Sequence, residues 1–233
     1  VDSVDDLLAL EPSVVVEAAG HGALREHGVA ILAHGCDLIA LSVGALADHE
    51  LQRRMSDAMA ASGARLRIAS GAIGALDAIG AAAIGGLTSV VHTTRKPAGS
   101  LMSHDEAAAL TEPREIFVGP AREAALLFPE NVNVSAAVSL AGIGFDRTMV
   151  RIIADPAATH NVHQVEAEGT FGTLRFEINN IPSDDNPKSA RLAAMSAVHT
   201  LLQCARERRS QPGSVATTMP ISTSLLPSLE GVP

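Results

Sequence analysis

The sequence predicts an α/β fold with a parallel sheet in its first part and a mainly antiparallel sheet in its second. In the first part, short apolar runs alternate with amphipathic segments at the spacing of strand–helix–strand units. In the second part, runs such as Thr173–Asn179 alternate between polar and apolar residues, which is typical of a sheet with one wet face. We therefore expect a Rossmann-type parallel sheet followed by an α+β catalytic domain.

Residues 1–87 are expected to form a partial dinucleotide-binding domain. Three apolar runs predict strands that are buried on both faces, namely Val14–Ala19, Leu38–Val43 and Leu66–Ala69. Helices are predicted between these strands. Gly35 is placed to end the first helix, and the second should begin after a cap at Asp48 and stop at Gly63.

The third strand leads into Ser70-Gly71, where it is expected to break. The chain should then restart as a helix whose apolar face is made of Ile73, Leu76, Ile84 and Leu87. Gly71 and Gly74 would let the backbone turn tightly and approach a ligand. Open α/β sheets bind ligands where strands give way to helices, so this turn is a candidate binding site. On spacing alone, an ordinary strand–helix connection fits equally well.

Residues 88–185 are expected to form the catalytic, substrate-binding and oligomerisation domain. Four strands are predicted, at Thr88–Thr94, Met149–Ala154, Asn161–Glu168 and Thr173–Asn179. Helices are predicted at Ala121–Phe128, with Pro120 at the first position, and at Asn131–Gly142. The Pro, Gly and Ser residues of Lys96–Pro113 predict an irregular, mobile loop.

The last part of the chain should contain one long helix and a tail. Asn186-Pro187 predicts the cap and first turn of a helix that reaches about Arg208, and residues 186–209 should pack back on the core. Residues 210–233 contain one charged residue and four prolines among Ser and Thr. We expect a disordered tail there.

The composition restricts the class of protein and its partners. Apolar residues make up 47% of the chain, yet Trp and Tyr are absent, so the core must be aliphatic. The net charge of −9 argues against nucleic acid and membranes as partners, and no apolar run is long enough to span a bilayer. Cys36 and Cys204 follow no spacing motif, which favours a reduced, cytoplasmic protein.

His163 is the strongest candidate for chemistry among nine histidines. On a strand it would share a face with Asn161, Val165 and Ala167 and point towards the apolar side. An imidazole titrates near pH 6.5, about the range needed for acid–base chemistry, although a hydrogen-bonded core histidine fits the pattern too. His160 would point to the opposite face, so no metal site is expected.

Five separated strings resemble the L-aspartate dehydrogenase family. The most specific is SGAIGALDAI, residues 70–79. The others are Asn131-Val132-Asn133-Val134, Asn161-Val162-His163, Asn186-Pro187-Lys188-Ser189 and Thr94-Arg95-Lys96. The resemblance covers most of Ser13–Arg206.

The resemblance implies roles for particular residues. His163 would be the acid/base residue that faces the nicotinamide. The expected cofactor-binding residues are Gly71, Ala72 and Asn133. The expected substrate-binding residues are Ser70, Asn161 and Lys188, with Arg95 as an alternative carboxylate partner.

The resemblance also implies an activity. Family members oxidise L-aspartate with NAD or NADP, through iminoaspartate to oxaloacetate and ammonia, or supply iminoaspartate to NAD biosynthesis. A homodimer acting on this small-molecule substrate is expected. Two alternatives stay open: another amino-acid or imine dehydrogenase of the same architecture, and a non-catalytic remnant that serves as an interaction module.

One family feature has no counterpart in these 233 residues. Family members begin with a strand, a G-x-G-x-x-G turn and a helix that hold the cofactor's pyrophosphate. That string does not occur here, and neither does the second-strand end whose acidic residue would normally select NAD over NADP. We expect the 233 residues alone to be inactive, to bind the dinucleotide weakly and to aggregate, and an upstream segment to restore activity.

Overall fold

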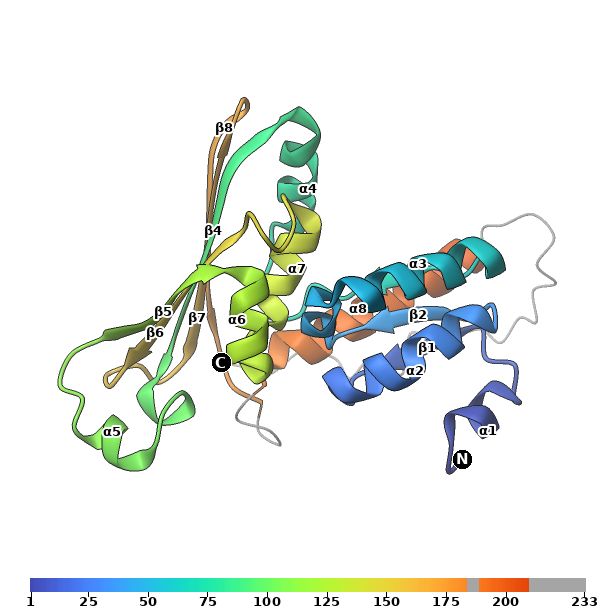
Figure 1. Cartoon of the computed structure of the whole chain (residues 1–233), viewed down its shortest axis with the longest axis horizontal. Coiled ribbons are helices and arrows are strands. Elements are labelled where there is room, and N and C mark those ends of the chain that lie inside the picture. The colour runs from blue at the N-terminus through green and yellow to red at the C-terminus, as the bar shows by residue number, and fades with distance from the viewer. Residues whose placement is uncertain (184–188, 210–233) are drawn as a thin grey trace, which may run out of the picture.

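The computed structural model describes residues 1–183 and 189–209, which form two sheets covered by helices (Figure 1). The first sheet has three parallel strands in the order β1 (Val14–Glu17), β2 (Asp37–Ala40) and β3 (Leu66–Ile68). This arrangement confirms the predicted parallel sheet. A short helix α1 (Val4–Leu8), which the sequence analysis did not predict, precedes it.

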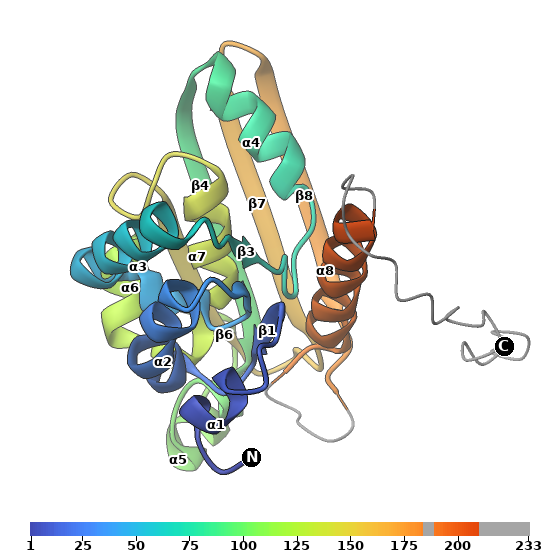
Figure 2. The same ribbon diagram turned by 90° about the vertical axis from the view of Figure 1, so that its right-hand side faces the viewer.

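Helices cover both faces of the first sheet because its central strand is apolar on both sides. Leu38 and Ala40 face the core that β2 shares with α2 (His21–Ala33) and α3 (His49–Ser62). Ile39, on the other face, packs with Cys204 of α8 (Arg191–Arg209). Figure 2 shows α8 on the side of the sheet opposite α2 and α3.

The predicted limits of α3 are confirmed by its capping contacts. The Asp48 carboxylate accepts hydrogen bonds from the backbone N–H groups of Glu50 and Leu51. Gly63 ends the helix with φ +78°, in the left-handed region that favours glycine. A 3-10 helix η1 (Val43–Ala47), which was not predicted, connects β2 to this cap.

The second sheet has five strands in the order β5-β6-β4-β7-β8. Their bounds are β4 (Leu87–Pro97), β5 (Arg114–Pro120), β6 (Met149–Asp155), β7 (Asn161–Gly169) and β8 (Gly172–Asn180). Only the pairing of β4 with β6 is parallel, which confirms a mainly antiparallel sheet. Three helices pack on one side of it, α4 (Leu76–Gly85), α6 (Ala121–Leu127) and α7 (Asn133–Ala141) (Figure 1).

The alternation of β4 and β7 decides which polar side chains reach the interior. Along β4, Val90, His92, Thr94 and Lys96 are all buried. Thr94 lies opposite His163 of β7 in the antiparallel register, and His92 lies opposite Val165. The strand pair therefore carries two histidines and a lysine into the protein on one face.

The predicted helix after Ser70-Gly71 is partly wrong. Ala75 has φ +62°, and α4 begins only after it. Ile84 is 91% exposed, and Leu87 is the first residue of β4. The apolar spacing thus continued across the end of a helix into a strand, which periodicity alone does not reveal.

Three other boundaries also differ from the prediction. The segment Lys96–Pro113 is not wholly irregular, because it contains the 3-10 helix η2 (Ala98–Ser100) and α5 (His104–Ala108), and β5 follows it. Pro120 is the last residue of β5 and precedes α6. Helix α8 begins at Arg191, after a β-bridge between Pro182 and Ala190. The predicted cap at Asn186-Pro187 and the predicted tail lie outside the described residues.

Candidate active site

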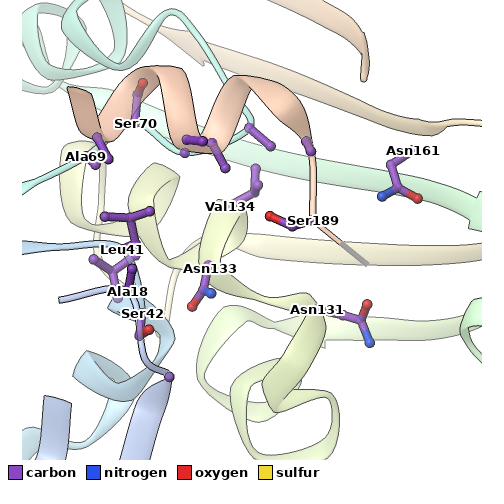
Figure 3. A pocket seen from close by; sticks show the side chains of 18 of the residues that line it. Ala18, Leu41, Ser42, Ala69, Ser70, Asn131, Asn133, Val134, Asn161 and Ser189 are labelled. Carbon is purple, nitrogen blue, oxygen red and sulfur yellow. The ribbon is translucent and has the colours of Figure 1, made fainter. Parts of the chain in front are cut away.

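A pocket of about 600 Å³ lies at the carboxyl ends of the three parallel strands. Ala18–Gly20 line it after β1, Leu41–Val43 after β2 and Ala69–Ala72 after β3. Figure 3 shows Ala18, Leu41 and Ser42 at one end of the pocket and Asn131 and Asn161 at the other, with Asn133 between them. Both sheets and helices α7 and α8 therefore contribute to one cavity, in the position where open α/β sheets bind ligands.

The pocket brings together most of the residues singled out from the sequence. Its lining includes Ser70, Gly71, Ala72, Asn133, Asn161 and His163. Lys188 lies outside the described residues. Arg95 does not line the pocket, because it lies on the opposite face of β4 and forms an ion pair with Asp155 (Nη1–Oδ2 2.9 Å).

The turn after β3 is tied to two distant elements. Gly71 has φ +67°, and its N–H donates to Ser196 Oγ of α8 at 2.9 Å. The carbonyl of Ala72 accepts a hydrogen bond from Asn180 Nδ2 at the end of β8, at 2.8 Å. Gly74 was predicted to let the backbone approach a ligand, but in the structure it faces Phe176 of β8. A Cβ at Gly74 would lie 2.7 Å from Phe176 Cζ, so the glycine allows close packing against β8.

Asn133 is held in one orientation. Its Oδ1 lies 3.0 Å from the N–H of Gly44 and 2.8 Å from His21 Nε2. A backbone N–H can only donate, so the atom that it meets is the amide oxygen, and His21 must also donate. The amide oxygen of Asn133 thus already accepts two hydrogen bonds, and its Nδ2 group remains as a donor. Asn133 was predicted both to donate to a ligand and to accept from it, and the structure favours the role of donor. A side chain at Gly44 would have to displace His21, since a Cβ would lie 2.5 Å from the His21 ring.

Glu17, which no sequence motif singles out, fixes the two loops that follow β1 and β2. It is buried, and Oε1 accepts from the N–H groups of Ala19 (2.8 Å) and Gly20 (2.9 Å). Ser42 donates its hydroxyl to Oε1 and its N–H to Oε2. One carboxylate thus fixes the loops after β1 and β2, and with them one end of the pocket.

His163 is buried in the pocket wall, with 4% of its surface exposed. The predicted direction of its side chain, towards the apolar face with Val165 and Ala167, is confirmed. Burial lowers its pKa well below the usual range, and the neighbouring His92 and Lys96 lower it further. The ring is therefore neutral at physiological pH and has a lone pair with which to take a proton.

Lys96 is a buried cation beside this histidine. Only 6% of it is exposed, its Nζ donates to Asn131 Oδ1 at 2.5 Å, and burial lowers its pKa to about 8. No described carboxylate lies within ion-pair distance of it. Lys96 also lines a second cavity of about 720 Å³, which shares Asn131 and Asn161 with the first. The sequence carries a signal for it, because alternation along β4 places Lys96 on the same face as the apolar Val90.

Within residues 1–183 and 189–209, no three or more His, Cys, Asp or Glu side chains are grouped so that they could hold a metal ion. No helix there combines the length and the apolar character needed to cross a bilayer.

Comparison with known proteins gives matches along most of the chain. Residues 77–204 match the family model described as aspartate dehydrogenase, C-terminal, and residues 1–69 match the NAD binding domain of homoserine dehydrogenase. The L-aspartate dehydrogenase of Ruegeria pomeroyi is 47% identical over 201 residues, which are 84% of this chain and 73% of that protein. The L-aspartate dehydrogenase of Pseudomonas aeruginosa is 46% identical over 195 residues, 82% of this chain and 73% of that one.

Solved structures show the same likeness. The crystal structure of aspartate dehydrogenase from Thermotoga maritima has a TM-score of 0.69 and 31% identity, and the match covers 85% of this chain and 77% of the other. A hyperthermophilic archaeal homoserine dehydrogenase in complex with NADPH has a TM-score of 0.53 at 9% identity, which supports the fold alone.

Proposed function

The chain belongs to the aspartate dehydrogenase family, and we propose that its pocket oxidises L-aspartate with NAD or NADP. A hydride leaves Cα of the amino acid, and iminoaspartate remains. Addition of water to the imine then gives oxaloacetate and ammonia. The names of the relatives at 47% and 46% identity favour this substrate over other amino acids or imines, and disfavour a non-catalytic interaction module.

The observation that carries the proposal is the meeting of His163, Asn133 and the Gly71 turn in one pocket. The residues around the turn suit the nicotinamide end of the cofactor, which accepts the hydride when bound. Gly20 and Gly71 have positive φ, and nothing lies within 4 Å of where their Cβ atoms would be. Asn133 presents an amide N–H donor, which would fix a carboxamide or a ribose.

We propose that His163 moves the proton. Hydride loss from Cα requires a neutral amine, and the imidazole would accept the proton that the ammonium group gives up. Once that proton has been released to solvent, the imidazole would take a proton from the water that adds to the imine and would return it to the nitrogen that leaves as ammonia. General acid–base residues of this kind contribute about a hundredfold or more to rate.

We propose that Lys96 binds a carboxylate of the substrate. Burying an ammonium group without an anion is costly, and the one hydrogen bond described for the Lys96 ammonium group is to a neutral amide. L-aspartate brings two carboxylates, so one of them can neutralise this charge inside the pocket. Lys188 stays a proposed partner for the second carboxylate.

We also propose that the protein is a cytoplasmic homodimer, as the family resemblance implies. Cys36 and Cys204 are free and buried, as suits a reducing compartment. Equilibrium sedimentation of the protein would give its mass, and a monomer at micromolar concentration would contradict the dimer.

The function is tested by turnover with a panel of amino acids. In the protein expressed from its full reading frame, L-aspartate should drive reduction of NAD or NADP with release of ammonia. L-asparagine and L-alanine, which lack the second carboxylate, should be much poorer substrates. If either of them reduced the cofactor as fast as L-aspartate or faster, the protein would be another amino-acid dehydrogenase.

A further inference from the structure

Behind His163 lies a short chain of buried polar groups that leads away from the pocket. His163 Nδ1 lies 3.2 Å from His92 Nε2, and His92 Nδ1 lies 2.8 Å from Ser135 Oγ of α7. His92 and Ser135 are fully buried, and the two imidazole rings stack with centroids 5.3 Å apart. Each ring nitrogen of His92 therefore has a partner, and the hydrogen bonds connect the pocket wall with helix α7.

Both hydrogen bonds can run in either direction. If Ser135 donates to His92, then His92 donates to His163, and His163 carries its proton on Nε2 towards the pocket. If His163 donates from Nδ1, then His92 donates to Ser135, and Nε2 of His163 presents a lone pair. Whether Nε2 of His163 carries a proton or a lone pair therefore depends on His92 and Ser135, which do not bond to Nε2.

Only the second arrangement suits a base. A neutral imidazole with its proton on Nε2 has no lone pair to offer the pocket and is a very weak acid. With the proton on Nδ1, Nε2 can take a proton from the substrate, and His92 accepts the hydrogen bond from the ring that has become charged. The step balances: one proton moves from the substrate to Nε2 and no other bond is broken.

We propose that His92 and Ser135 are positioning residues that hold His163 with its proton on Nδ1 and its Nε2 lone pair facing the pocket. The inference rests on the proposed function, because it assigns the base-ready form to a histidine that acts on the substrate. A neutral partner differs from a carboxylate in that it orients the ring without raising its pKa strongly. Burial, which lowers the pKa of His163, therefore keeps the ring unprotonated between turnovers.

The first test reads the tautomer directly. Nitrogen-15 NMR of histidine-labelled full chain, with the His163 signals assigned from their loss in His163→Gln, distinguishes a protonated Nδ1 from a protonated Nε2. We expect the Nδ1–H form to exceed half of the population near neutral pH. A majority of the Nε2–H form would overturn the inference. This measurement needs no substrate, so it stands even if the protein fails to oxidise aspartate.

The second test separates positioning from packing. His92→Gln keeps an acceptor near the place of Nε2, whereas His92→Phe fills the space without one. We expect kcat to fall on the order of ten- to a hundredfold in His92→Phe. This is the scale seen when a group that orients a metal-bound histidine is removed from other proteins. His92→Gln should stay within a few-fold of the unsubstituted protein, and cofactor affinity should be unchanged in both.

Two serines on the same helix provide the matched control. Ser135→Ala removes the partner of His92, while Ser139→Ala removes a buried hydroxyl whose hydrogen bond, among the described residues, is to the Ser135 carbonyl. Ser135→Ala should lower kcat, and Ser139→Ala should not. If His92→Phe does not fold, this pair still decides the matter. Full activity in Ser135→Ala, in a protein that does oxidise aspartate, would overturn the inference and leave the proposed function intact.

Discussion

At the scale of single residues, the account depends first on His163. Replacing it with Ala should lower turnover at least about a hundredfold, because the pocket then has no neutral base beside the substrate. Cofactor affinity should be retained, since the hydrogen bonds that orient Asn133 and the Gly71 turn go to other residues. Stopped-flow measurement of cofactor reduction checks this. Turnover within a few-fold of the original would make His163 a hydrogen-bonded core residue.

Lys96 gives a prediction about substrate affinity and pH. Lys96→Met should raise KM for L-aspartate and lower kcat/KM about ten- to a hundredfold, the scale of one hydrogen bond to a charged group. In the unsubstituted protein, kcat/KM should fall as pH rises through about 8, because Lys96 then loses its charge. Arg95→Met is the control, since Arg95 lies on the other face and is paired with Asp155.

A flat profile of kcat/KM against pH across that range would contradict the role of Lys96. So would an equal effect of Arg95→Met and Lys96→Met on KM. Either outcome would move the carboxylate contact to another residue of the pocket.

Asn133 can be tested without changing its own side chain. Gly44→Ala would force His21 and the Asn133 oxygen apart, because the new Cβ would lie 2.5 Å from the His21 ring. Cofactor affinity should fall several-fold, the effect of about 0.5–1.5 kcal/mol for one neutral hydrogen bond. Gly22→Ala has open space around its Cβ and should change nothing. Calorimetric titration with the cofactor compares the two, and equal affinities would contradict the assignment.

The sequence predicted the site residues that stand in recognisable strings, but it did not predict the residues that orient them. His163 and Asn133 stand in recognisable strings, and both line the pocket. Their supports, His92 and His21, come from elements 71 and 112 residues away in the chain. No local pattern predicts such contacts, because they depend on how β4 pairs with β7 and on how α2 lies relative to α7. Lys96 could have been predicted, since a lysine on the buried face of a strand is rare and indicates a specific role.

At the scale of elements, the strands and the well-capped helix α3 were predicted because their signals are local. The Asp48 cap and the Gly63 stop are both observed. The start of α4 was missed because Ala75 adopts φ +62°, which alanine disfavours. Helix α5 was missed although it begins with a capping box, Ser103 with Glu106, which the sequence already showed.

The two buried histidines of the strand pair β4–β7 should lower the free energy of unfolding at acidic pH. His92 has its pKa lowered to about 3 by burial and by the charge of Lys96, and burial also lowers that of His163. The unfolded chain binds these protons near pH 6.5 and the folded chain does not, so the free energy of unfolding falls as pH drops below about 6.5. The slope should approach about 1.4 kcal/mol per pH unit for each histidine.

This slope is measurable by urea unfolding between about pH 6.5 and 5, above the range in which most carboxylates titrate. His92→Gln should reduce it by about one histidine's share while leaving the His163 contribution. The comparison uses the slope, so a change in overall stability does not obscure it. An unchanged slope would mean that His92 is accessible to protons in the folded protein.

At the scale of the whole molecule, the central claim is that one pocket between two sheets unites the hydride acceptor with L-aspartate and His163. The most direct measurement follows the hydride itself. The protein from its full reading frame is supplied with L-aspartate deuterated at Cα and with NAD or NADP, and the reduced cofactor is analysed by mass spectrometry. The account predicts that the reduced cofactor carries the deuterium and that His163→Ala forms it far more slowly. Reduced cofactor without deuterium, or no reduction by L-aspartate at all, would contradict the claim.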